Sequence, residues 1–284
     1  MRWVVVDAPL DSSGRGRGEQ RAPDALRAAG LLTALGAEDG GRVEAVVDDP
    51  VRDPASGLIG AAQVRRAGAA IAERVDELLT TGRRPLVVGG DCTILPGICL
   101  ALPPAVTLWF VDGHPDFYDG RSSETGEGAD MDLSVVTGHG PTAAVGRDGP
   151  LVDPGRVHLM GHRPPADGLG RAEADRIDPR IHQLPAAQLR RRGPGEVGAE
   201  LAAAGDGPAW LHLDLDAVDP ADLPAVSYPE PDGLRWPELT ALVTPLARAD
   251  RLLGMSVTDL NVDLDPDGRH ARRVVEVLAE LLVP

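Results

Sequence analysis

The chain has 284 residues, of which 43% are hydrophobic and only 3% aromatic, so its core must consist mainly of aliphatic side chains. The formal net charge of −16 argues against nucleic acid and anionic membranes as partners, because both would repel a negative surface. No apolar run is long enough for a signal peptide or a membrane-spanning helix, and Cys92 and Cys99 form no disulfide framework. We therefore expect a cytoplasmic protein with a single domain over residues 1–284.

Short apolar runs alternate with helical patterns along the chain. Strands are predicted over residues 3–6, 42–47, 85–88, 106–111, 156–160, 210–213 and 252–260, and helices over residues 23–35, 61–80, 93–102, 236–247 and 272–282. This alternation predicts an α/β fold with three layers, α/β/α, around a mostly parallel sheet. The long loops at 119–132 and 221–233 are candidate active-site loops, because loops of that length in compact domains are often functional.

Acidic and imidazole side chains follow two of the predicted strands. Asp112, His114 and Asp116 follow one strand, and Asp214 and Asp216 follow another. Side chains two residues apart on an extended chain point the same way, so each set can converge on one point. An isolated Asp-x-Asp is commonplace as a helix cap, but two clusters after two apolar strands favour a pair of bridged metal ions. Four carboxylates and one imidazole suit a hard cation such as Mn²⁺, and without a cation so much buried charge would be very costly.

Three segments resemble the signature motifs of the arginase/agmatinase/formiminoglutamase (ureohydrolase) family. They are Gly-Gly-Asp-Cys-Thr at 89–93, Asp-Gly-His-Pro-Asp at 112–116 and Asp-Leu-Asp-Ala-Val-Asp-Pro at 214–220. Shorter similarities at 21–31, 229–234 and 259–261 extend the resemblance over most of the chain. The resemblance implies the three-layer fold, two Mn²⁺ ions and hydrolysis of the C–N bond of a guanidine or amidine, often with release of urea. Members of this family are often oligomers, so the resemblance also allows a homo-oligomer.

The resemblance implies a role for each residue of the two clusters. Asp112 and Asp214 would bridge the two metals. Asp116 would complete the first site, metal A, whereas His114 and Asp216 would complete the second, metal B. Asp116 would also accept a hydrogen bond from the attacking water and is a candidate catalytic residue. The substrate would be a small guanidino compound.

Four departures from the family pattern bear on the activity. Cys92 stands where metal A has a histidine, and because a thiol is a poor ligand for Mn²⁺, metal A would be weak, absent or a different ion. Ala129 stands where arginases have a proton-shuttling histidine, and Thr125 and Glu127 stand where Ser and Asn bind the substrate's carboxylate. Asp259 would pair with the guanidinium group, although it is one methylene shorter than the family's glutamate. The alternatives are a packing role for Cys92 and a turn role for Asp259.

These departures argue against ordinary arginase activity. The Cys-for-His change resembles a branch of the family that acts on N-hydroxylated arginine, which favours a specialised hydrolase of a guanidino or N-hydroxyguanidino compound. The alternative is a non-catalytic family member with a regulatory or assembly role that has lost full metal binding. Four other histidines near these loops and strands are interpreted as structural: His139, His162, His182 and His212.

Overall fold

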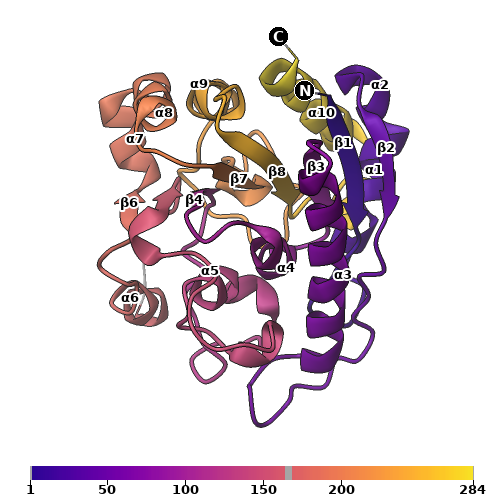
Figure 1. Cartoon of the computed structure of the whole chain (residues 1–284), viewed down its shortest axis with the longest axis vertical. Coiled ribbons are helices and arrows are strands. Elements are labelled where there is room, and N and C mark those ends of the chain that lie inside the picture. The colour runs from indigo at the N-terminus through magenta and orange to yellow at the C-terminus, as the bar shows by residue number, and fades with distance from the viewer. Residues whose placement is uncertain (1, 164–167, 284) are drawn as a thin grey trace.

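The computed structural model describes residues 2–163 and 168–283 (Figure 1). Its centre is an eight-stranded sheet in the order β2-β1-β3-β8-β7-β4-β5-β6, in which every neighbouring pair of strands is parallel. The strand bounds are Trp3–Ala8 (β1), Glu38–Arg42 (β2), Arg84–Gly89 (β3), Thr107–Val111 (β4), Val157–Met160 (β5), His182–Leu184 (β6), Ala209–Asp214 (β7) and Leu252–Thr258 (β8). The sheet is therefore parallel throughout, as strands alternating with helices require.

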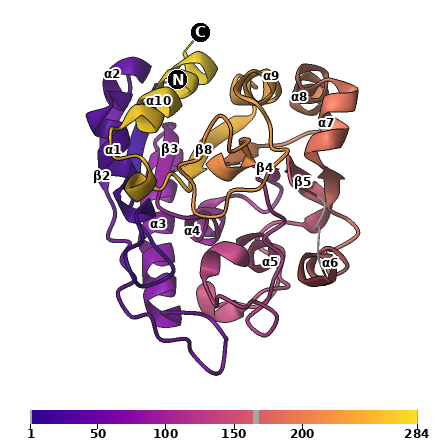
Figure 2. The same ribbon diagram turned by 180° about the vertical axis from the view of Figure 1, so that it is seen from behind.

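Helices cover both faces of this sheet, which confirms the three-layer α/β/α architecture (Figures 1 and 2). One layer contains α1, α2, α7, α8, α9 and α10, and the opposite layer contains α3, α4 and α5. The helix bounds are Ala22–Ala28 (α1), Leu31–Leu35 (α2), Ala61–Thr80 (α3), Ile94–Ala101 (α4), Asp132–Val136 (α5), Gly168–Ala174 (α6), Ala186–Arg192 (α7), Pro194–Ala203 (α8), Trp236–Ala247 (α9) and Arg269–Leu282 (α10). Within the described ranges, every helix is too short or too polar to cross a membrane.

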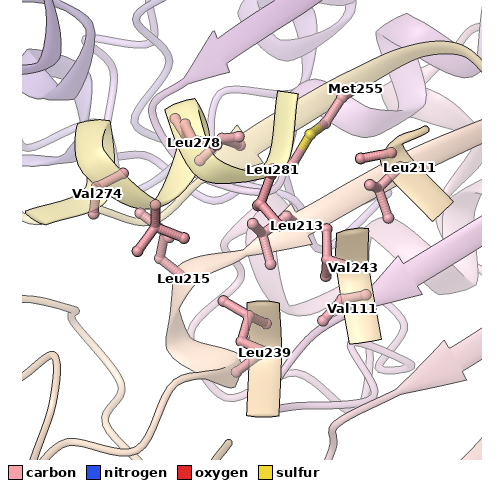
Figure 3. Packing of buried hydrophobic residues seen from close by; sticks show 14 of the residues in the cluster. Val111, Leu211, Leu213, Leu215, Leu239, Val243, Met255, Val274, Leu278 and Leu281 are labelled. Atoms are coloured by element: carbon pink, nitrogen blue, oxygen red, sulfur yellow. The ribbon is translucent and has the colours of Figure 1, made fainter. Parts of the chain in front are cut away.

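The central strands are buried on both faces, so each sends alternate side chains into two different hydrophobic clusters. In β7, Leu211 and Leu213 belong to the cluster with α9 and α10, which Figure 3 shows from close by. Trp210 belongs to the cluster with α3 and α4 on the other face. Since side chains alternate along a strand, His212 and Asp214 lie on the same side as Trp210.

Most of the predicted helices agree with the structure, and α3 and α9 begin and end as predicted. The helix predicted over residues 23–35 is instead two helices, α1 and α2. Gly30 separates them because it adopts a left-handed backbone with a φ of 93°, which interrupts the helical hydrogen bonds. The additional elements β6 and α5 to α8 are short. The longest of them, α8, has 10 residues, too few to display a clear periodicity.

The strand predicted over residues 42–47 is wrong, because β2 covers Glu38–Arg42. Gly40 lies directly against β1, where a Cβ atom would come within 2.7 Å of the Val5 carbonyl oxygen. The apolar residues that suggested a strand, including Ala45 and Val47, are buried in the hydrophobic cluster with α3. The close approach of the Gly40 backbone to β1, rather than the hydrophobicity of the segment, therefore decides which residues form the edge strand.

The order of the strands brings four loops to one edge of the sheet. β3 precedes β4 in the chain, but β8 and β7 lie between them in the sheet. The segments at 89–93, 259–261, 214–216 and 112–116 follow these four neighbouring strands. Ligands of open α/β sheets bind beyond the carboxyl ends of the strands, at points where the strand order reverses. The fold thus assembles the motifs that the sequence separates.

Candidate metal centre

A cavity of about 360 Å³ opens at this edge of the sheet. Asp112 does not line this cavity but is completely buried next to Gly113 and His114, which do. The cavity is lined by the other predicted site residues, namely Cys92, His114, Asp116, Thr125, Glu127, Asp214, Asp216 and Asp259. The structure therefore brings the predicted residues together around one hollow.

Asp112, His114 and Asp216 offer ligand atoms that all lie within 4.8 Å of one another. His114 Nδ1 is 2.8 Å from Asp216 Oδ2, and the Gly113 backbone N–H donates to Asp216 Oδ1 at 2.9 Å. The backbone N–H of His114 donates to Asp112 Oδ1 at 2.6 Å, which fixes that carboxylate. These three side chains therefore form a group that could hold a metal ion.

Cys92 faces the same cluster, as the sequence predicted. Its thiol donates to Asp214 Oδ2 at 2.6 Å, and its sulfur is 3.0 Å from Thr258 Oγ1. The Asp216 backbone N–H donates to Asp214 Oδ1 at 2.6 Å. Ligand atoms of Cys92, Asp214 and Asp259 form a second group within 4.8 Å. Asp259 is thus placed against the cluster rather than only in a turn.

Two of the cluster's aspartates have left-handed backbones, with a φ of 47° at Asp116 and 67° at Asp259. Among the described residues, only Asp232 shares a positive φ without being glycine. Aspartate tolerates this conformation better than most residues, but it is uncommon and is found often at functional sites. The Asp259 backbone N–H is held by the Gly90 carbonyl oxygen at 2.9 Å.

The structure adds two residues that the sequence did not single out as ligands. Asp132, at the start of α5, is completely buried and offers an oxygen within 4.8 Å of ligand atoms of Cys92 and Asp116. His212 Nε2 is 3.2 Å from Cys92 Sγ. The sequence contained a signal for His212, because it lies two residues before Asp214 on one strand and so points the same way. Asp132 follows a long loop and carries no such signal.

At the mouth of the cavity, Glu127 is not a free charge. It forms an ion pair with Arg17 and accepts a hydrogen bond from the Tyr228 hydroxyl at 3.4 Å. Thr125 Oγ1 donates to Asp130 Oδ2 at 2.6 Å and accepts the Glu127 backbone N–H at 3.0 Å. Arg17 therefore neutralises the negative charge of Glu127, the residue that the family resemblance places near the substrate's carboxylate.

Glu173 on α6 is a further carboxyl group of the cavity wall. It is buried, and its Oε1 accepts the Phe117 backbone N–H at 2.8 Å. Burial raises the pKa of Glu173 to about 7 against the opposing effect of that hydrogen bond. Its carboxyl group can therefore gain or lose a proton near neutral pH.

Electrostatics mark the cluster as a cation site. Burial, reinforced by neighbouring carboxylates, raises the pKa of Asp112, Asp116 and Asp132 well above the usual range. Burial lowers the pKa of His114, but the charge of Asp216 outweighs burial and raises this pKa to about 9. Oδ2 of Asp112 and Oδ2 of Asp132 are buried without a hydrogen-bond partner. A divalent cation would satisfy these oxygens and offset the repulsion, so the donor set fits a metal.

A family profile described as Arginase family matches residues 1–283. The chain belongs to the arginase family. Members of this family are hydrolases that act on C–N bonds in amidines, which agrees with the resemblance of the three motifs.

The similarity to individual arginase-family proteins is distributed over the chain. An N(omega)-hydroxy-L-arginine amidinohydrolase from Streptomyces lavendulae is 29% identical over 229 residues, which are 78% of this chain and 76% of that protein. An arginase from Bacillus caldovelox is 26% identical over 302 residues, covering 98% of this chain and 96% of its own. The solved structure of the arginase from Bacillus caldovelox superposes with a TM-score of 0.88 at 27% identity, over 100% of this chain and 98% of that one.

The arginase-family cluster predicts a distinctive pH dependence for the metal-free protein. Carboxyl groups with raised pKa, such as Asp112, stabilise the fold below their unfolded pKa of about 4, and this contribution is lost as the pH rises through the folded pKa. The contribution of His114 is complete below about pH 6.5 and is lost as the pH rises through about 9. We expect the Tm of chelator-treated protein to fall from about pH 4 to about pH 9, and added divalent ion to remove most of this fall.

The matched variant for this measurement is Asp112→Asn, which keeps the shape of the side chain but cannot ionise. The variant should show a smaller fall of Tm with pH in the metal-free state. A metal-free Tm that stays constant or rises over the same range would contradict the electrostatic account.

Proposed function

We propose that this arginase-family protein hydrolyses the guanidino or N-hydroxyguanidino C–N bond of a small molecule and releases urea or a urea analogue. The observation that carries the proposal is the carboxylate cluster beside the cavity, in which Oδ2 of Asp112 and Oδ2 of Asp132 are buried without a hydrogen-bond partner. The substrate class is supported by similarity to an N-hydroxy-L-arginine amidinohydrolase and to arginases.

The donor set supports two Mn²⁺ ions bridged by Asp112 and Asp214. At metal B, His114 and Asp216 add an imidazole and a carboxylate, and these oxygen-rich ligands suit manganese. When held by these residues, such ions would supply a water of lowered pKa as the nucleophile. Burial of the ionised carboxylates without a cation would be very unfavourable, so we expect the native protein to bind the ions.

Metal A differs because its remaining ligands are Asp116 and Cys92. Burial and the nearby carboxylates raise the pKa of the Cys92 thiol, which keeps its proton and donates it to Asp214 in the metal-free protein. An ion at metal A must displace that proton, since only the thiolate is a good ligand. This requirement makes metal A the weaker manganese site.

Asp259 and Thr125 both line the cavity and would contact the substrate there. The Asp259 carboxylate is suited to accept hydrogen bonds from a planar guanidinium group. Thr125 and Glu127 occupy the place where the family binds a carboxylate, but Glu127 is engaged by Arg17. The substrate's far end therefore meets a neutral, hydrogen-bonding surface, which favours a compound other than plain arginine.

The leaving amine needs a proton, and Ala129 cannot provide it. Asp116 lies beside the ligand cluster, and Glu173 lines the same cavity with a pKa raised to about 7 by burial. A carboxyl group that titrates near neutral pH is an effective proton donor and acceptor. Asp116 and Glu173 are therefore two cavity groups suited to hold and transfer the proton.

The test of this function is elemental analysis of the purified protein combined with a release assay for urea and hydroxyurea over a panel of guanidino compounds. We expect bound manganese and release of one of these products. Asp214→Ala removes the proposed bridge and should abolish both. Full loading with metal and no product from any compound would instead support the non-catalytic alternative.

Asp259→Ala should leave the metal content unchanged and reduce kcat/KM for cationic guanidines. The loss of a buried charge-assisted contact costs about 2–5 kcal/mol, which corresponds to a decrease of about 30-fold to about 5,000-fold. Steady-state kinetics and metal analysis of the same preparation measure both effects. Asp232→Ala, at the left-handed aspartate outside the cluster, is the control for backbone strain alone. If metal content falls together with activity, Asp259 is a metal ligand instead.

Cys92→His should increase the Mn²⁺ affinity of metal A, because it restores an imidazole to the family's ligand position. Substitution of residues that contact a metal's ligands shifts metal affinity by roughly 10–100-fold. Substitution of a ligand itself should shift the affinity at least as much. Titration of the metal-free protein with Mn²⁺ compares the wild type, Cys92→His and Cys92→Ala. Equal affinities for all three proteins would show that Cys92 is only a packing residue.

A further inference from the structure

A second group of possible metal ligands shares Cys92 with the cluster and lies entirely in the interior. Cys92, His212 and Asp132 come from the loop after β3, from β7 and from α5, and at most 1% of each is exposed. Cys92 Sγ is 3.2 Å from His212 Nε2, and Asp132 Oδ2 is 4.0 Å from the same nitrogen. A sulfur, a nitrogen and an oxygen donor thus converge in the interior.

Asp132 gives independent evidence that this group forms a cation site. Its Oδ1 accepts the Leu133 backbone N–H at 2.5 Å, but its Oδ2 is buried without a hydrogen-bond partner and is directed toward His212. A bare carboxylate oxygen in the interior is costly, and native proteins seldom leave one unsatisfied. Asp112 has the same feature at its Oδ2, and its carboxylate lies within 4.8 Å of ligand atoms of Cys92 and His212.

His212 is held as metal-binding histidines usually are. Its Nδ1 is 2.8 Å from Ser256 Oγ, and its ring is stacked on Phe110 with 5.0 Å between the ring centroids. Ser256 Oγ also accepts the Trp210 Nε1–H at 3.1 Å, and a hydroxyl oxygen can accept two such bonds. In the tautomer with its proton on Nδ1, the lone pair of Nε2 faces Cys92. An outer hydrogen bond of this kind fixes the orientation of metal-ligating imidazoles.

We propose that Cys92, His212, Asp132 and Asp112 bind a zinc-like ion, and that His212 supplies the imidazole missing from position 92. This proposal rests on the proposed function in one respect, because the zinc-like ion would occupy the position of metal A. His212 would then be a ligand rather than the structural residue that the sequence suggested. Asp132 would serve the ion in addition to the family's carboxylates.

The distances and the donor types both favour zinc over manganese. In a tetrahedral zinc site, neighbouring donors lie roughly 3.4–3.6 Å apart, close to the 3.2 and 4.0 Å found around His212 Nε2. A thiolate with an imidazole is a softer set than carboxylates alone and selects Zn²⁺ or Co²⁺ over Mn²⁺. Binding would release the thiol proton that Cys92 now donates to Asp214, so affinity should rise with pH.

The test is a titration of the full-length metal-free protein with Co²⁺, followed by displacement with Zn²⁺. Wild-type protein should show a sulfur-to-cobalt charge-transfer band in the near ultraviolet that saturates at one equivalent. His212→Asn can keep the hydrogen bond to Ser256 but lacks Nε2, so it should bind Co²⁺ at least 10–100-fold more weakly. Cys92→Ser should lose the charge-transfer band. His162→Asn removes another buried imidazole outside the group and should behave as wild type.

Asp132→Asn tests the same site if the His212 variant fails to fold. The asparagine can keep the hydrogen bond to Leu133 but carries no charge. It should also weaken Co²⁺ binding. Unchanged affinity in either folded variant, or no charge-transfer band in the wild type, would overturn the assignment. The spectrum does not depend on turnover, so the two proposals fail separately. Urea release without the band refutes the zinc-like site alone, and the band without product release refutes the hydrolase alone.

Discussion

The concentration of negative charge at one edge of the sheet is the constraint on which the rest of the site depends. The parallel sheet places the ends of β3, β8, β7 and β4 side by side, and aspartates follow three of these strands directly. Burial and mutual repulsion raise the pKa of Asp112 and Asp259, so the metal-free protein retains protons within the cluster, as in the contact between Cys92 and Asp214. A bound cation replaces those protons, which links metal binding to stability and to pH.

The surrounding fold makes this cluster rigid. Two hydrophobic clusters hold the central strands from both faces, so the aspartates at the strand ends cannot shift independently of the sheet. The loop after β3 is fixed by contact with the chain after β1, where a Cβ atom at Gly90 would lie 1.6 Å from the Leu10 carbonyl oxygen. Only glycine permits this approach, and it sets the direction in which Cys92 enters the cluster. A ligand set defined by backbone contacts in this way is selective for ion size and geometry.

Specificity would arise mainly from residues other than the aspartates of the three motifs. Arg17 from an N-terminal loop and Tyr228 from the loop before α9 reach Glu127 and make the mouth of the cavity neutral. Glu173 adds a carboxyl group whose pKa is about 7. Cys92 and His212 add a sulfur atom and an imidazole nitrogen to the carboxylate cluster. Substitutions around the proposed bridging aspartates could therefore adapt the same fold to a different ion and a different guanidino compound.

The sequence by itself determined the α/β/α class, the full extent of α3 and α9, and the residues after β4 and β7 that form the cluster. Each of these features has a local pattern, either a long amphipathic period or acidic residues two apart after an apolar run. Only the tertiary structure decided that Asp132 and His212 stand beside Cys92, and that Arg17 neutralises Glu127. It also decided that polar β2, rather than the apolar segment after it, joins the sheet. These outcomes depend on contacts between segments far apart in the chain, and burial against such segments leaves no periodic trace in the sequence.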